Sequence, residues 1–468
     1  MDSAKAKILR EFLATLPESL AWRLAKAVEV DRLGGGRSLP HEVILEGLRP
    51  VLRHTPQHER TPTPLRLFCR PFEDLLSLAP RKEKVYGAIA RGSIKPVWTW
   101  LKDTLAPEAH AGYESAVRGD VLGYRLEEAR AHAVEFWTLA GTAILDALSG
   151  DAARKAARVA LGGDLVVADA REMALLLLAG DEISELQAKM PRPTPTLGDD
   201  LVWMLRGIYD RVAARVPDAG AYVAVVAMRR LERPWEAMKL PLLISRQTQD
   251  TLISSTDMGL VGEILFNEIE NHAATIRSLR PQAAFDADAL VSHVTRFAEL
   301  SNGLVKEIEM RRDGKWGQRL MKERAAVAGA MDAFMERAPR DILAALPTQK
   351  SGSYAGGPRV PDLARGPDAE KAERALGFAR LIVGCRAIAA KASFGAKLKD
   401  ADTEAAVALK GYNEDIVKEL RGPEGPRRDN AEAYFAIAAE LTTLLFSAEE
   451  GEFLRRRARA AMGIQAAA

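Results

Sequence analysis

Apolar residues recur every three or four positions along most of this chain, and this spacing constrains the fold more than any other sequence feature. The clearest example is the stripe of Leu290, Val294 and Phe297. Such a period is typical of an amphipathic α-helix. Sustained alternation of apolar and polar residues, which would indicate strands, does not occur. Only 6% of the residues are aromatic, which also favours helices over sheets. We therefore predict an all-α, multi-helical fold.

Proline and glycine divide this helical pattern into segments. A chain of 468 residues suggests about three domains. Residues 190–195 (MPRPTP) form a first linker, and residues 349–367, rich in Gly, Pro and Ser, are expected to be a flexible second linker. We predict three helical blocks, at residues 1–190, 196–348 and 368–468. Three Thr-Pro pairs in residues 53–64 predict a Pro-rich strap in extended conformation.

The charge of the chain is nearly balanced overall but uneven locally. With 66 basic and 64 acidic residues, the formal net charge is +2, which excludes a polyanionic tail and a histone-like polycation. Residues 1–110 carry 18 basic and 13 acidic groups, whereas residues 111–200 carry 9 and 15. The basic first segment and the acidic second segment could dock on each other or offer two separate electrostatic faces.

The sequence also suggests where the protein is found. Cys69 and Cys385 are its only cysteines, so it has neither a disulfide framework nor a cysteine-rich zinc module, which fits a reducing compartment. The N-terminal residues are charged from Asp2 onward and lack the continuous apolar core of a secretory signal. The apolar runs stay short of the about 20 residues that a transmembrane helix needs. We therefore expect a cytoplasmic protein without a transmembrane segment.

The middle block contains a predicted antiparallel helical hairpin, residues 286–338. Asp313-Gly314, between two apolar stripes, suits a tight turn between helices. The tip is basic and carries one tryptophan, a combination typical of recognition surfaces. The residues that we expect to bind a partner are Arg311, Arg312, Lys315, Trp316 and Arg319. Two alternatives stay open: Trp316 folds back onto the hairpin end, or one helix continues through the glycines.

A second candidate surface lies in the N-terminal block, where basic and aromatic residues are mixed. Phe68, Phe72 and Trp98 could stack on the bases of a single-stranded nucleic acid while cations contact its phosphates. The cations of this alternative are Arg66, Arg70, Lys82, Lys84, Arg91 and Lys95. Core packing of the rings beneath extended Arg and Lys side chains explains the same pattern.

Signatures of catalysis are missing or incomplete. The sequence has no phosphate-binding glycine motif after a strand, no Gly-x-Ser-x-Gly elbow and no His-Glu-x-x-His motif. Glu-x-x-x-His spacing on two predicted helices leaves a metal site as an alternative, although helical di-metal sites use Glu-x-x-His. Its ligands would be Glu128, His132, Glu135, Glu268 and His272. Separately, His54, His58 and Cys69 could supply three metal ligands from the Pro-rich segment, or Cys69 could act as a nucleophile beside arginines. No residue is predicted as catalytic, cofactor-binding or metal-binding.

These observations favour a non-catalytic helical scaffold or adaptor protein that mediates protein–protein interactions. No cofactor is expected, and an enzyme is less favoured than a binding protein. A nucleic-acid-associated protein and a helical metal-dependent enzyme are the alternatives. Ala375, Gly377 and Gly384 on one predicted helix suit close helix packing, either inside the protein or at the seam of a homo-oligomer.

Overall fold

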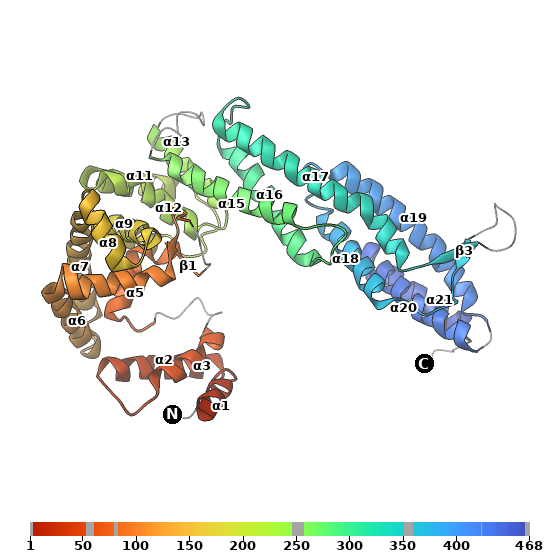
Figure 1. Cartoon of the computed structure of the whole chain (residues 1–468), viewed down its shortest axis with the longest axis horizontal. Helices are drawn as coiled ribbons and strands as arrows, with labels where there is room; N and C mark the ends of the chain where they lie inside the picture. The colour runs from red at the N-terminus through yellow and green to blue at the C-terminus, as the bar shows by residue number, and fades with distance from the viewer. Residues whose placement is uncertain are drawn as a thin grey trace. The chain divides into compact units, whose positions relative to one another are not determined.

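The computed structural model describes residues 3–52, 60–78, 83–245, 257–350, 359–422 and 424–463. In this part of the chain nearly all regular structure is helical, which confirms the predicted all-α fold (Figure 1). The first helices are α1 (Ser3–Leu13), α2 (Glu18–Leu33), α3 (His41–Leu52), α4 (Pro64–Cys69), α5 (Arg91–Trp100), α6 (Pro107–Leu122), α7 (Leu126–Ala147), α8 (Asp151–Leu161), α9 (Asp164–Leu178), α10 (Gly180–Lys189), α11 (Asp199–Arg215), α12 (Gly220–Arg230) and α13 (Lys239–Ser245).

The C-terminal half continues in the same way. Its helices are α15 (Gly259–Ser278), α16 (Ala287–Glu307), α17 (Lys315–Ala344), α18 (Ala369–Cys385), α19 (Gly395–Glu419), α20 (Pro426–Leu445) and α21 (Ala448–Ala461). Shorter helical turns are η1 (Arg70–Leu75), η2 (Leu101–Leu105), η3 (Pro217–Ala219) and η4 (Pro234–Met238). Within the described ranges, no helix combines the length and the apolar character that crossing a membrane requires.

Strands form two small pairs in the described residues. β1 (Leu76–Ser77) pairs in parallel with β2 (Ile89–Ala90). β3 (Thr348–Lys350) pairs antiparallel with β4 (Arg359–Pro361). Strands of two or three residues are too short to carry a sheet core, so helix packing supplies the interior.

The helices form two compact units. The described residues up to Ile264 build the first unit, and those from Leu265 onward build the second. The boundary falls inside α15 and inside the predicted block 196–348. Helices α11 and α12, which belong to the predicted block 196–348, pack on α10 of the predicted N-terminal block. The division into three blocks is therefore not confirmed.

The predicted linker at residues 190–195 lies within the first unit and is attached to its core at two residues, Met190 and Thr194. Met190 is fully buried, and its carbonyl accepts a hydrogen bond of 2.6 Å from Arg230 Nε. The N–H of Thr194 donates to the carbonyl of Arg230 over 2.7 Å. The prolines here mark an extended segment that docks on the end of α12, because proline favours extended backbone without continuing a helix.

The predicted linker 349–367 is ordered at its described ends. β3 and β4 lie in and beside it, and Leu363 is buried. The carbonyl of Leu363 accepts a hydrogen bond from Asn430 Nδ2, and that of Gly366 accepts one from Tyr434 Oη. Side chains of α20 thus bind the backbone at the described end of this stretch, and the flexibility of the linker as a whole stays a prediction.

Parts of two predicted segments lie outside the described residues. These are residues 53–59 of the predicted strap and residues 351–358 of the second linker. The end of the strap is described, and there the Oγ1 of Thr63 accepts a hydrogen bond of 3.2 Å from the N–H of Arg66. The Thr-Pro pair thus starts α4: threonine caps the helix, and proline occupies its first position.

The arms of the predicted hairpin 286–338 are α16 and α17, separated by residues 308–314. The carboxylate of Asp286 caps α16 by accepting a hydrogen bond of 3.0 Å from the backbone of its first turn. Arg324 of α17 donates to the carbonyl of Ser301 on α16 over 3.2 Å, so the two helices are in contact near the turn. The alternative of one helix continuing through the glycines is wrong.

Helix α9 is buried on almost every side in the first unit. It packs against α5, α7, α8 and α10, and Met173 and Leu176 are fully buried. Gly141 lets α7 approach α9 closely, because a Cβ at this position would lie 2.9 Å from the carbonyl oxygen of Ala174. A helix enclosed in this way carries its polar side chains into the interior as well.

Candidate functional site

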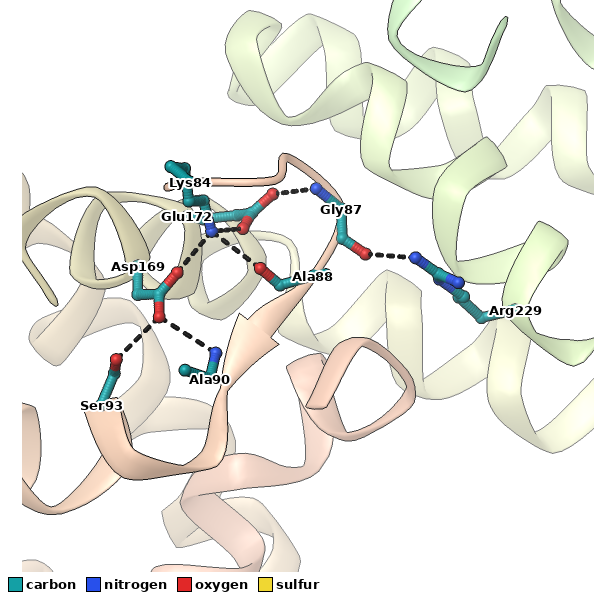
Figure 2. Close-up of polar contacts among 8 residues, drawn as sticks. All are labelled: Lys84, Gly87, Ala88, Ala90, Ser93, Asp169, Glu172 and Arg229. Atoms are coloured by element: carbon teal, nitrogen blue, oxygen red, sulfur yellow. Dashed lines mark hydrogen bonds and ion pairs between the residues drawn. The ribbon is translucent and has the colours of Figure 1, made fainter. Parts of the chain in front are cut away.

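A cluster of buried charges joins the loop before α5 to α9 (Figure 2). Lys84 Nζ lies 2.5 Å from Asp169 Oδ1 and also contacts Glu172 Oε2. Asp169 is fully buried, and Glu172 is 2% exposed. The two carboxylates stand three positions apart, so they share one face of α9. We call Lys84, Asp169 and Glu172 the Lys84 cluster.

Asp169 also holds the N-terminus of α5. Its Oδ2 accepts hydrogen bonds from the N–H of Ala90, over 3.0 Å, and from the hydroxyl of Ser93, over 2.7 Å. Ala90 directly precedes the first turn and does not cap it with a side chain. The first turn of a helix has unpaired N–H groups and a positive dipole end. A carboxylate from another helix therefore supplies the missing cap.

Gly87 is fixed from two sides (Figure 2). Its N–H donates to Glu172 Oε1 over 2.6 Å, and its carbonyl accepts from Arg229 Nη2 over 3.1 Å. Its φ is +70°, and a Cβ at this position would overlap the side chain of Ile264. Both the backbone conformation and the close contact require glycine.

Burial and hydrogen bonding have opposite effects on the pKa of Glu172, and burial is the larger effect, so the pKa lies above its usual value. Burial raises the pKa of its carboxyl, whereas Lys84, the N–H of Gly87 and the hydroxyl of Tyr222 each lower it by stabilising the ionised form. Burial also raises the pKa of Tyr222, and the Glu172 carboxylate adds to that shift. Tyr222 is therefore a neutral hydroxyl that donates to the carboxylate.

The ammonium of Lys84 is saturated by the protein itself. It has three protons and three acceptors: Asp169, Glu172 and the carbonyl of Ala88, which lies 2.9 Å away. Such a group has no proton left for a substrate or a phosphate. The Lys84 cluster therefore positions the loop at residues 83–90.

This loop presents one aromatic side chain to solvent. Tyr86 lies between the anchored residues Lys84 and Gly87, and it is 57% exposed. A side chain whose backbone is already fixed loses less conformational freedom on binding than one in a mobile loop. Tyrosine is also one of the residues most often found at the centre of protein interfaces.

The aromatic residues predicted to stack on nucleic acid are mostly enclosed. Phe68 and Phe72 are fully buried, and the ring of Trp98 lies 4.9 Å from that of Phe68. Because Phe68 and Phe72 pack in the core of the first unit, they cannot stack on bases. The alternative explanation, core packing beneath Arg and Lys side chains, holds for these two rings.

The cations of that surface are also partly used inside the molecule. Arg66 Nη1 lies 2.8 Å from the carboxylate of Glu29, and Lys84 is enclosed in its cluster. Of the other cations, Arg70 is half-buried, Arg91 and Lys95 are exposed, and Lys82 lies outside the described residues.

At the hairpin tip, the structure corrects the expectation of an exposed tryptophan. Trp316 is 1% exposed, and its ring lies 5.6 Å from that of Phe266 on α15. The adjacent Gly317 has no room for a Cβ, because the carbonyl of Arg311 occupies that space. Trp316 therefore folds back into the core, which agrees with one of the two alternatives that the sequence left open.

The cations of the tip differ in their surroundings. Arg311 Nη2 lies 2.7 Å from Asp313 Oδ2. Arg319 Nε donates to Glu270 over 2.9 Å, and its guanidinium lies 4.7 Å above the ring of Phe266. The other two predicted contact residues, Arg312 and Lys315, are exposed.

The residues of the predicted metal site fall into two groups. Glu128, His132 and Glu135 lie on α7 in the first unit, whereas Glu268 and His272 lie on α15 in the second. In the part of the chain that the structure describes, no three or more His, Cys, Asp and Glu residues are arranged to hold a metal ion.

The environment of Cys69 does not activate a thiolate. Burial raises the pKa of its thiol to about 12, and Glu73 adds to the shift while Arg91 opposes it. A nucleophilic cysteine needs a lowered pKa. His54 and His58, its possible partners, lie outside the described residues.

Asp169 and Glu172 were not predicted from the sequence. A signal for them exists, because they interrupt a mostly apolar helix, and carboxylates at core positions require a buried partner. The partner itself could not be inferred, since Lys84 is 85 residues away from Asp169 in the chain.

The chain matches no family model, and comparison with curated proteins and with solved structures gives no match either. The geometry of the described residues is therefore the basis for a functional proposal.

Proposed function

We propose that this protein is a non-catalytic helical scaffold or adaptor, and that the loop at residues 83–90 is part of its recognition surface. The observation that supports this proposal is the exposure of Tyr86 between Lys84 and Gly87, both of which are anchored to α9. A fixed and exposed aromatic side chain suits binding to another protein.

The composition of the Lys84 cluster supports the same proposal. Burying two carboxylates and one ammonium contributes little net stability, because the loss of hydration offsets most of the attraction. Buried ionic groups can instead define one geometry among several. Here Asp169 and Glu172 bind the backbone at Ala90 and Gly87, so the geometry that they define is that of the loop.

The hairpin tip is a second candidate surface within this proposal. Arg312 and Lys315 are exposed there, but Trp316 is buried and is not available as an aromatic anchor. A nucleic-acid-associated function is the weaker alternative, supported by the exposed Arg91 and Lys95. The arrangement of its predicted ligands gives no support to a metal-dependent enzyme.

The test captures binding partners with the full chain by cross-linking. It compares three forms of the chain: wild type, Tyr86→Ala and Trp203→Ala. We expect Tyr86→Ala to reduce recovery of the wild-type partner at least tenfold. Trp203→Ala is the matched control, because Trp203 is 64% exposed on α11 in the same unit. Equal recovery by Tyr86→Ala and wild type would exclude the loop from recognition.

Two further arms separate the surfaces. A loss of recovery in Arg312→Ala alone would move the recognition surface to the hairpin tip. The alternative function would be favoured if the chain captures nucleic acid and the affinity falls steeply as the salt concentration rises. This capture should then be lost in the double variant Arg91→Ala, Lys95→Ala.

A further inference from the structure

Two histidines of the second unit face each other across neighbouring helices. His272 lies on α15 and His293 on α16, and their Nδ1 atoms are 2.9 Å apart. The two rings are tilted by 57°, with centroids 5.1 Å apart. Both side chains are half-buried, so solvent reaches the pair. The contact brings two ring nitrogens to one point from residues 21 positions apart in the chain.

The distance fixes the chemistry of the contact. Two nitrogens at 2.9 Å share one proton, so one ring donates and the other accepts. Burial lowers the pKa of His272, and the neighbouring His293 lowers it further. In this contact the accepting ring has an unprotonated Nδ1, and its lone pair points at the other Nδ1. Neutral imidazole nitrogens are common ligands for zinc, copper and nickel.

The charges around the pair balance each other. Glu268 lies one turn before His272, and Arg296 lies one turn after His293. Arg296 donates to Glu268 Oε1 over 3.1 Å through both Nε and Nη2, and it also lies 3.8 Å from Glu299. This ion pair forms a second polar contact between α15 and α16. It leaves the imidazole pair without a strong net charge beside it.

We propose that His272 and His293 bind one divalent transition metal ion, Zn²⁺, Ni²⁺ or Cu²⁺, through their two Nδ1 atoms. The donating ring moves its proton from Nδ1 to Nε2, so both Nδ1 lone pairs become available. Because the two nitrogens now face each other, bonds of about 2.0–2.1 Å to one ion require them to move apart and the rings to turn toward a common point. Water completes the coordination, because the described residues include no group of three protein ligands. Ca²⁺ and Mg²⁺ do not fit, since they prefer oxygen ligands.

The experiment uses the full chain without an affinity tag, treated with a chelator and then titrated with Zn²⁺, Ni²⁺ or Cu²⁺ at pH 7.5. His54→Gln and His58→Gln are present in every sample, because histidines four positions apart bind metals by themselves. We expect one ion per chain, and at least tenfold weaker binding in His272→Gln and in His293→Gln. His132→Gln, which changes a half-exposed histidine of the first unit, should bind as the parent does.

Spectroscopy of the Cu²⁺ form gives a second measurement, and its result on the parent does not depend on how the variants fold. Electron paramagnetic resonance of the parent should show coupling to two imidazole nitrogens, and each single variant should show one or none. Unchanged affinity in His272→Gln, a spectrum without nitrogen coupling, or no binding of any of the three ions would overturn the proposal.

Discussion

At the scale of single residues, Lys84 is the group on which the buried cluster depends. Replacing it by methionine leaves Asp169 and Glu172 buried without their cation, and breaking a buried ion pair in this way costs about 3–5 kcal/mol. We expect Lys84→Met to lower the free energy of unfolding of the first unit by that amount. Urea denaturation followed by circular dichroism measures it.

The control for Lys84→Met is an ion pair at the surface. Lys189 lies 2.6 Å from Glu185 on the exposed side of α10, and exposed pairs contribute about 1 kcal/mol or less. Lys189→Met should therefore be nearly neutral. Equal losses in the two variants would mean that Lys84 contributes no more than a surface charge.

His110 predicts a dependence of stability on pH. The side chain is fully buried against Trp98, and neither ring nitrogen has a hydrogen-bond partner among the described residues. Burial lowers its pKa, with a smaller opposing effect of Glu114. The unfolded chain therefore takes up a proton near pH 6.5 that the folded chain does not, and stability falls as the pH falls below that value.

We expect His110→Leu to remove this part of the acid sensitivity, which amounts to at most about 2 kcal/mol between pH 7 and pH 5. At pH 7 the variant should be at least as stable as wild type, because two unpaired polar atoms leave the core. Denaturation curves at the two pH values measure both effects. The same acid-induced loss in wild type and variant would contradict the assignment.

At the scale of elements, local spacing predicted the helices but not the side that each one buries. Leu290, Val294 and Phe297 are all fully buried, as their stripe predicts. Ile8 and Phe12 have the same four-residue spacing on α1, yet they are 66% and 61% exposed. The period of the apolar residues indicates that a segment is helical. Which face of the helix is buried depends on the other helices that pack against it.

The candidate site was hidden from the sequence for the same reason. Lys84 was predicted as a cation of a nucleic-acid surface, because the residues near it in the chain are a mixture of basic and aromatic side chains. Its partners Asp169 and Glu172 come from α9, and Trp316 is buried by Phe266 of α15. Contacts between helices that are far apart in the chain decide both outcomes, and such contacts cannot be predicted from a single sequence.

The loop at residues 83–90 depends on one glycine. Gly87→Ala places a side chain at a φ of +70° and against Ile264, so we expect a loss of about 1–3 kcal/mol and displacement of the loop. Gly92→Ala is the matched control, since its Cβ would meet no atom within 4 Å and it lies in α5. Denaturation and limited proteolysis of both variants measure the difference. If Gly87→Ala is as stable and as resistant as Gly92→Ala, the loop does not depend on this contact.

The hairpin tip gives a second prediction at this scale. Trp316→Ala should cost about 3–5 kcal/mol, because it removes a fully buried aromatic side chain from the contact with α15. Arg312→Ala, at an exposed position of the same tip, should change stability by less than about 0.5 kcal/mol. Similar small effects of both substitutions would contradict the burial of Trp316.

At the scale of the whole molecule, the uneven charge of the sequence has a structural counterpart. Lys84 belongs to the basic segment 1–110, and its partners Asp169 and Glu172 belong to the acidic segment 111–200. Both segments lie in the first unit. Of the two interpretations of the charge pattern, docking of one segment on the other is therefore supported at this position.

The two compact units lead to a prediction about unfolding. Each unit has its own buried core: the Lys84 cluster lies in the first, and Trp316 lies in the second. We expect calorimetry of the full chain to show two transitions. Lys84→Met should lower only one of them and Trp316→Ala only the other. For units of this size, each lowering is about 6–20 °C.

The double variant completes this test. Substitutions at sites without shared partners have additive effects, so Lys84→Met combined with Trp316→Ala should lower each transition as far as the corresponding single variant does. Mild control substitutions, Lys189→Met in the first unit and Arg312→Ala in the second, should leave both transitions in place. One transition that moves with either substitution would show instead that the units unfold together, and that a loss in either core is distributed over the whole chain.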